Sequence, residues 1–139
     1  MIGYISTMTE PDASIHILLV DDTPKATERA QEALGGEVPS VKFQQVFFEH
    51  ELSKALDEAD FQLVVTEQDL RWADGVDVIR HVREARPDCP VIMFARRYDQ
   101  AQAVEALKAG VEDYVLKTEI HKSRLGGAVS KALGTLAKG

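Results

Sequence analysis

The sequence has a single cysteine and no long hydrophobic run, and each shortage excludes a class of protein. Cys89 is the only cysteine among 139 residues, so an internal disulfide and the zinc-binding cysteine spacings are excluded. No apolar run approaches the roughly 20 residues that a membrane-spanning helix needs. The first residues lack the basic segment and the long apolar run of a secretory signal peptide. These absences favour a protein of the reducing cytoplasm, with Cys89 chemically inert.

Positive charge is also scarce in this chain. There are 16 Lys and Arg residues against 23 Asp and Glu residues, which gives a formal net charge of −7. Such a charge repels nucleic-acid phosphates and anionic membrane surfaces, so neither is an expected partner. What is present, 45% hydrophobic and 28% charged residues, is typical of one soluble globular domain.

Short apolar runs alternate with amphipathic segments along the chain. The runs have the length of buried strands, which we expect at residues 15–20, 41–48, 61–66, 90–94 and 111–116. A helix is expected after each strand, and the apolar residues of the fourth helix are Ala101, Val104 and Leu107, before a stop at Gly110. The strands are apolar enough to be covered on both faces, except that partial alternation in 41–48 indicates a place near the sheet edge.

This pattern predicts an α/β fold of three layers, in which a five-stranded, parallel, doubly wound sheet has (βα)5 topology. Residues 1–14 have no periodicity and contain Pro11, so they are expected to be a loosely ordered lead-in. The folded domain is expected to span residues 15–137.

Charged side chains collect where the predicted strands end. Asp21 and Asp22 follow the first strand, Glu67 the third, Ala95 the fourth and Lys117 the fifth. These strand ends meet along one edge, where open α/β sheets bind ligands. Grouped carboxylates repel each other unless a cation or the lysine neutralises them, and carboxylate oxygens are ligands that magnesium favours.

Four motifs, in this order and spacing, resemble the receiver domains of two-component response regulators, which have a flavodoxin-like fold. They are Ile17 to Asp22, Asp74-Gly75, Pro90 to Met93 and Gly110 to Lys117. In that family an acidic pair and an aspartate after the third strand hold magnesium, and the aspartate accepts a phosphoryl group from a histidine kinase. A hydroxyl after the fourth strand and a lysine after the fifth bind the phosphoryl oxygens. An aromatic residue on the fifth strand reports the change to a partner surface.

The resemblance assigns roles residue by residue. Asp21 and Asp22 match the acidic pair, Lys117 matches the lysine, and Tyr114 matches the switch aromatic. Asp69 lies where the family supplies a backbone carbonyl ligand to the metal.

Other positions depart from the family pattern. Glu67 stands at the phospho-acceptor position, Ala95 at the switch hydroxyl, and Arg71 and Thr118 where prolines are common. Glutamate reaches one methylene further, and a displacement of about 1 Å can cost ~100-fold in group transfer. Its single charge also falls short of the roughly −1.5 to −2 of a phosphoryl group. Several departures together favour natural divergence over one engineered change at Glu67.

These features predict a non-enzymatic receiver domain of a phosphorelay that is not phosphorylated at the usual site. It is expected to bind a histidine kinase or a downstream effector through the fourth helix, fifth strand and fifth helix, about residues 99–137. A homodimer also stays open. Magnesium binding stays open because Glu67 could hold Lys117 in the place of the cation.

Three alternatives compete with this interpretation. The first is a competent receiver that is phosphorylated on Asp69. The second is a magnesium-dependent phosphatase of similar build, and the third is a flavodoxin-type nucleotide binder, although no glycine-rich loop follows the first strand. The sequence also leaves two roles open for Trp72, partner contact or packing on its own domain. Arg96 and Arg97 fit either a basic patch beside the site or a solvated loop.

Overall fold

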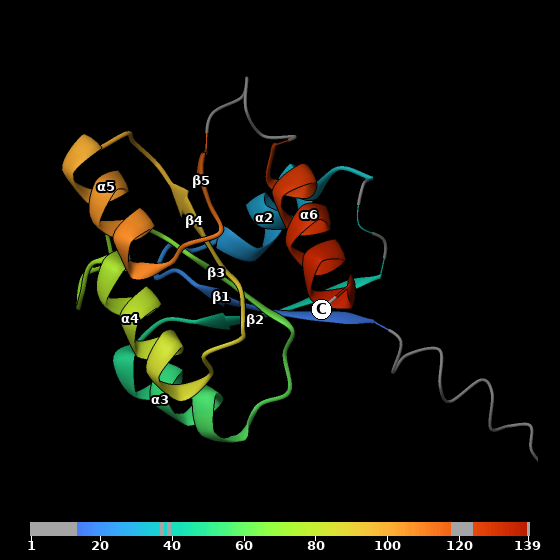
Figure 1. Ribbon diagram of the computed structural model, residues 1–139, viewed down its shortest axis with the longest axis horizontal. Helices are drawn as coiled ribbons and strands as arrows, with labels where there is room; N and C mark the ends of the chain where they lie inside the picture. Colours follow the sequence, from blue (N-terminus) through green and yellow to red (C-terminus); the bar gives the residue numbers. More distant parts are fainter. Residues whose placement is uncertain (1–13, 37, 39, 118–123, 139) are drawn as a thin grey trace, which may run out of the picture.

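Five parallel strands form one sheet in the order β2-β1-β3-β4-β5 (Figure 1). The computed structural model describes residues 14–36, 38, 40–117 and 124–138. The strands are β1 (Ile15–Val20), β2 (Val41–Val46), β3 (Leu63–Thr66), β4 (Val91–Ala95) and β5 (Asp113–Leu116). The predicted α/β sheet and the edge position of the second strand are both confirmed. Thr118 and nearly all of the expected lead-in lie outside the described residues.

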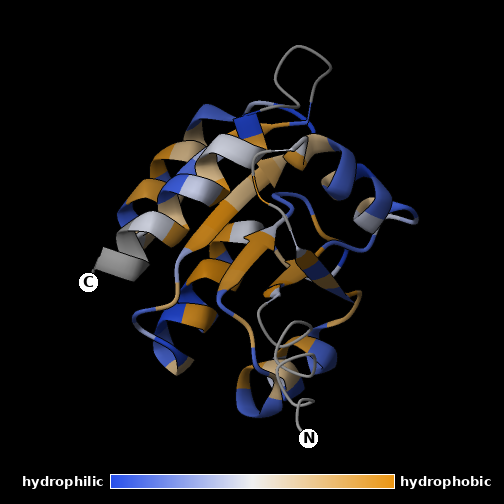
Figure 2. Ribbon diagram, turned by 90° about the vertical axis from the view of Figure 1, so that its right-hand side faces the viewer, coloured by the Kyte–Doolittle hydropathy of each residue, from blue (hydrophilic) through white to orange (hydrophobic). Residues whose placement is uncertain are grey.

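Helices cover both faces of the sheet, which gives the three predicted layers. They are α2 (Ala26–Leu34), α3 (Glu49–Glu58), α4 (Gly75–Ala85), α5 (Gln100–Ala109) and α6 (Arg124–Lys138). The helices α2 and α6 lie on one face and α3, α4 and α5 on the other (Figure 1). The strands are the most hydrophobic part of the ribbon, and the helices carry their hydrophilic residues outward (Figure 2). No helix among the described residues has the length and apolarity to cross a bilayer.

Two cores follow from this layering because successive strand residues point to opposite faces. Ile17 and Leu19 pack with Leu125 and Val129 of α6 on one face. On the other face Leu18, Val20 and Met93 are among the residues that pack with α3 and α4, including Leu52, Val76, Ile79 and Val82. The strands are therefore fixed from both sides, and their carboxyl ends are held in register along one edge.

Some predicted boundaries and one predicted face are wrong. β2 ends at Val46, since Phe48 is already the N-cap of α3, while β3 begins at Leu63 and β5 begins at Asp113. The α5 face is a larger error: Val104 and Leu107 are 43% and 64% exposed, and Ala106 is the buried residue of the helix. The inward side of α5 is thus formed by Ala106, with Ala103 and Ala109 half-buried, and the large apolar side chains lie on the other side.

Candidate functional site at the carboxyl edge of the sheet

An ion-pair cluster lies at the carboxyl ends of β1, β3 and β5. The ammonium of Lys117 is 2.6 Å from Asp21 Oδ2 and 2.9 Å from Glu67 Oε1. Both carboxylate side chains are buried, and Lys117 is 13% exposed. These residues are far apart in the sequence, and the parallel sheet brings them together because each directly follows a strand.

Both carboxylate oxygens of Glu67 are occupied by donors. Oε2 accepts hydrogen bonds from the backbone N–H groups of Gln68, at 2.5 Å, and Asp69, at 3.0 Å. Oε1 accepts from Lys117 at 2.9 Å and lies 3.5 Å from the guanidinium of Arg96. The side chain of Glu67 is 0% exposed. The chain itself therefore satisfies this carboxylate, and none of it reaches solvent.

The two aspartates of the acidic pair have separate partners. Asp21 Oδ1 accepts from the backbone N–H of Thr23 at 2.9 Å, and Asp21 Oδ2 binds Lys117. Asp22 Oδ2 accepts from the backbone N–H of Arg71 at 2.8 Å. A proline at position 71 would lack that N–H group. The departure at Arg71 therefore supplies the donor that ties Asp22 to the loop after β3.

This donor set does not fit a magnesium ion as it is arranged. Magnesium needs oxygen ligands that converge with near-octahedral geometry. Asp21 and Glu67 instead converge on the ammonium of Lys117, while Asp22 turns to Arg71. In the part of the chain that the structure describes, no three His, Cys, Asp or Glu side chains form a group that could hold a metal.

Asp69, the alternative acceptor, is held by a two-pronged ion pair. Its oxygens bind Arg97 Nε at 3.1 Å and Arg97 Nη2 at 3.0 Å. Arg97 also lies 3.2 Å from Asp99. The pKa of Arg97 is raised, chiefly by the hydrogen bonds to Asp69 and then to Asp99. Asp69 is thus paired with a cation on the loop after β4, away from Lys117.

Ala95 and Tyr114 occupy the positions of the switch pair. Ala95 is buried at the end of β4, and its carbonyl accepts the N–H of Lys117 at 2.7 Å. The Tyr114 hydroxyl donates to Gln68 Oε1 and accepts from the N–H of Asp99 at 3.1 Å. Burial is the main cause of the raised pKa of Tyr114. Tyr114 is therefore bonded into the site, although Ala95 provides no hydroxyl.

Comparison with known proteins adds an independent observation to this geometry. A profile of the response regulator receiver domain matches residues 17–130. The chain belongs to this family. Receiver domains are the signal-receiving modules of two-component systems, as the sequence resemblance predicted.

Curated relatives of this receiver domain include a transcriptional regulatory protein and a chemotaxis protein. The transcriptional regulatory protein ZraR of Salmonella typhimurium is 29% identical over 119 residues, which cover 86% of this chain and 26% of ZraR. The chemotaxis protein CheY-3 of Vibrio cholerae is 33% identical over 64 residues, 45% of this chain and 49% of that protein. The chain thus spans only part of the length of these relatives.

Solved structures show the same fold. A CheY-like receiver domain protein from Methanospirillum hungatei superimposes with a TM-score of 0.78 at 19% identity, covering 91% of this chain and 98% of that one. The receiver domain of DrrB in its BeF3-activated form gives 0.72 at 23% identity, covering 87% and 98% of the two chains. At this level of identity the likeness establishes the fold alone.

Sequence reasoning missed one residue of the receiver site and left others unassigned. Gln68 is fully buried and bonded on every polar group, yet a glutamine in a loop gives no signal in a sequence. Arg96 reaches Glu67. Trp72 packs on its own domain, where its Nε1 donates to the carbonyl of Phe47 at 2.9 Å. Burial raises the pKa of Cys89 to about 11, in accord with an inert thiol.

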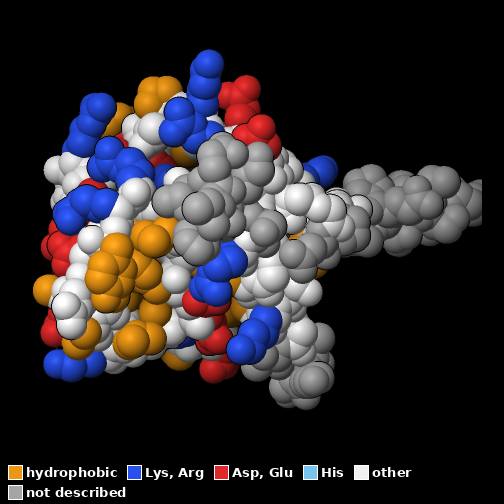
Figure 3. Space-filling model, turned by 90° about the horizontal axis from the view of Figure 1, so that it is seen from above, with side chains coloured by type: hydrophobic (Ala, Val, Ile, Leu, Met, Phe, Trp, Pro, Cys, Tyr) orange, Lys and Arg blue, Asp and Glu red, His pale blue; other side chains and the backbone are white. Residues whose placement is uncertain are grey.

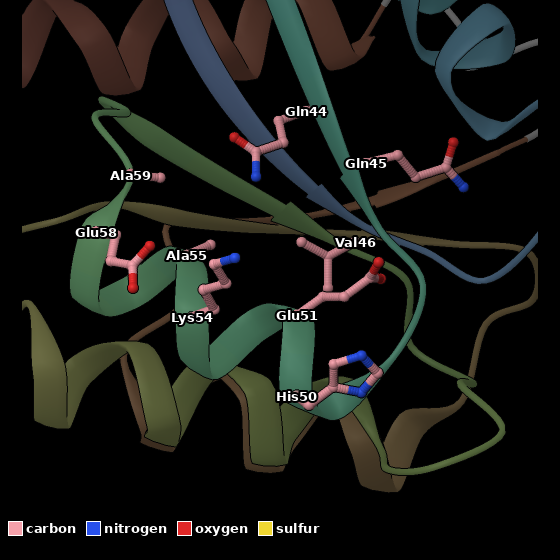
Figure 4. A pocket seen from close by; sticks show the side chains of 9 residues that line it. All are labelled: Gln44, Gln45, Val46, His50, Glu51, Lys54, Ala55, Glu58 and Ala59. Carbon is pink, nitrogen blue, oxygen red and sulfur yellow. The ribbon is translucent and has the colours of Figure 1, made fainter.

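A separate groove lies between the edge strand β2 and α3 (Figure 4). It encloses about 520 Å³. Figure 4 shows Gln44 and Val46 of β2 facing Lys54 and Glu58 of α3 across it. None of its lining residues belongs to the ion-pair cluster, so the receiver site is a packed network and not part of this cavity.

Proposed function

We propose that this receiver domain does not accept a phosphoryl group at the usual position and acts by binding protein partners. The domain is taken to span residues 15–137. Its relatives include a transcriptional regulatory protein and a chemotaxis protein, and the proposed role is non-enzymatic signalling in a phosphorelay.

The observation that carries the proposal is the state of the Glu67 carboxylate. An acceptor needs an oxygen lone pair free to attack in line, and a displacement of about 1 Å can cost ~100-fold in rate. Both oxygens of Glu67 are occupied by hydrogen bonds or ion pairs, and the side chain is 0% exposed. The negative charge at the acceptor position is balanced by Lys117 at 2.9 Å and by the exposed Arg96 at 3.5 Å.

The proposed partner face is built by α5, β5 and α6, about residues 99–137. Hydrophobic side chains gather on the α5 side of the molecule among charged ones (Figure 3). Among the described residues, the large apolar side chains exposed in and beside α5 are Tyr98, Val104 and Leu107, at 60%, 43% and 64%. Large apolar side chains that a fold leaves outside in a group mark a site of protein contact. The proposed partner is a histidine kinase or a downstream effector.

Intact-mass analysis after incubation with acetyl phosphate and magnesium tests this proposal. We expect no phosphoryl mass on the native chain. A Glu67→Asp variant shortens the side chain, withdraws the carboxylate from Lys117 and leaves an exposed acceptor oxygen, so we expect it to gain one phosphoryl group slowly, without the help of a switch hydroxyl.

Phosphoryl mass on the native chain would contradict the proposal. An Asp69→Asn variant then identifies the acceptor: if the added mass disappears, Asp69 is phosphorylated despite its pairing with Arg97. A phosphatase would be indicated instead by turnover of a generic phosphoester that Asp22→Ala abolishes.

A further inference from the structure

Gln68 connects the acceptor position to three other groups. It follows Glu67, is 0% exposed, and its N–H donates to Glu67 Oε2. Its Nε2 donates to the carbonyl of Arg97 at 3.2 Å and lies 3.4 Å from Asp69 Oδ2. Its Oε1 accepts the hydroxyl proton of Tyr114. A buried amide with every polar group bonded has one orientation, because each alternative leaves a buried polar atom without a partner.

The chain of contacts continues from Tyr114 to the start of α5. The Tyr114 hydroxyl accepts the N–H of Asp99 at 3.1 Å. Asp99 is the N-cap of α5, where its carboxylate accepts the N–H of Gln102 at 3.0 Å. Hydrogen bonds from Gln102 and from Arg97 lower the pKa of Asp99. The ring of Tyr98 packs edge-to-face on Tyr114 with the centroids 6.0 Å apart.

We infer that Gln68 is a positioning residue that couples the Glu67 site to the partner face on α5. Its Oε1 accepts the hydroxyl proton of Tyr114 and so fixes the position of that side chain. Tyr114 in turn contacts the N–H of Asp99, at the start of α5, and the ring of Tyr98. This coupling rests on the proposed function and adds its mechanism: the face has one arrangement, set by hydrogen bonds and not by a phosphoryl group.

A purely structural role for Gln68 makes a different prediction. If the side chain only fills space, Gln68→Met preserves the volume and leaves the bond between the Tyr114 hydroxyl and the N–H of Asp99 as it was. If Gln68 is the link, the same variant leaves the carbonyl of Arg97, at 3.2 Å, as the remaining acceptor of the Tyr114 hydroxyl, and the hydroxyl shifts although the core stays packed. Amide exchange at Asp99 distinguishes the two roles because it reports on the bond to Tyr114 and not on volume.

The experiment compares native protein with Gln68→Met, Tyr114→Phe and the double variant. We expect amide exchange at Asp99 to become about tenfold faster in each single variant, as the loss of one hydrogen bond allows. In the double variant we expect no further acceleration, because both changes break the same path. In Gln68→Met the pKa of Tyr114, followed by NMR of labelled tyrosine, should fall, because the variant lacks the Gln68 Oε1 acceptor that favours the protonated phenol.

Gln62→Met is the matched control. Gln62 Oε1 accepts the N–H of His16 at 2.8 Å, at the amino ends of β1 and β3 and away from the acceptor position. This variant should therefore change neither reading. The coupling is overturned if Gln68→Met leaves amide exchange at Asp99 at the native value, or if the effects of the two single variants add. Neither result bears on phosphorylation, which the intact-mass analysis decides separately.

Discussion

At the scale of single residues, Lys117 decides the electrostatics of this receiver domain. Its ammonium is the cation nearest to the buried carboxylates of Asp21 and Glu67 in the described residues. Removing one partner of a buried ion pair is costly because it leaves an uncompensated charge away from water. Here two such charges would be left, with only the 58%-exposed Arg96 at 3.5 Å from Glu67 to offset them.

We therefore expect Lys117→Met to lower the free energy of unfolding by about 3 kcal/mol or more. Urea denaturation at pH 7 measures this loss. Lys108→Met is the matched control, since Lys108 is 69% exposed and pairs with Glu105 at 3.6 Å, and exposed pairs contribute roughly 0–1 kcal/mol. Equal losses in the two variants would show that the buried cluster contributes no more than a surface ion pair.

The same residue predicts how magnesium affects stability. In the native chain Lys117 occupies the position where the charges converge, so magnesium should not move the urea midpoint beyond a sodium chloride control of equal ionic strength. In Lys117→Met the freed carboxylates can turn to a cation, and binding to the folded state alone raises its stability by mass action. A rise in the midpoint of the native chain that is specific to magnesium would contradict this account.

At the scale of elements, the sequence predicted which residues meet but not how their side chains pair. Asp21, Glu67 and Lys117 could be grouped because the ends of parallel strands share one edge. The pairing of Asp69 with Arg97 could not, since two loops without periodicity set that geometry. The outward face of α5 was also missed, because Ala103, Ala106 and Ala109 repeat with the same helical spacing as Ala101, Val104 and Leu107.

The start of α4 limits the space behind the site. A Cβ atom added at Gly75 would lie 2.7 Å from the carbonyl oxygen of Glu67 and 2.6 Å from Met93 Cε. This carbonyl is part of Glu67, the first residue after β3, so it cannot move without displacing Glu67 itself. Glycine at this position therefore lets the helix begin directly beneath the acceptor position.

We expect Gly75→Ala to cost about 1–3 kcal/mol of folding stability through overpacking. The strain should also weaken the contact of Glu67 with Lys117, and thermal unfolding followed by circular dichroism measures the loss. Gly36→Ala is the control, because a Cβ there meets nothing within 4 Å. A Gly75→Ala variant as stable as Gly36→Ala would mean that the loop after β3 gives way freely, and that α4 does not fix the site.

At the scale of the whole molecule, charge and surface area bear on what covers the α5 face. Each copy carries a net charge of −7, so two copies repel each other at low salt. In the part of this face that the structure describes, three large apolar side chains are exposed, whereas a stable interface buries about 800 Å² on each side. Self-association through so small a patch would have to overcome this repulsion, which favours a different protein as the occupant.

We therefore expect a monomer in sedimentation velocity at micromolar concentration and low salt. Leu107→Lys should leave the free energy of unfolding within about 0.5 kcal/mol of native, because the side chain is largely in solvent. Phe48→Lys, at the N-cap of α3 and 56% exposed, is the control for a charge added elsewhere. A dimer that Leu107→Lys abolishes and Phe48→Lys preserves would instead place a second copy of the chain on the α5 face. In that case the homodimer left open by the sequence is the working form, and high salt should strengthen it by screening the repulsion.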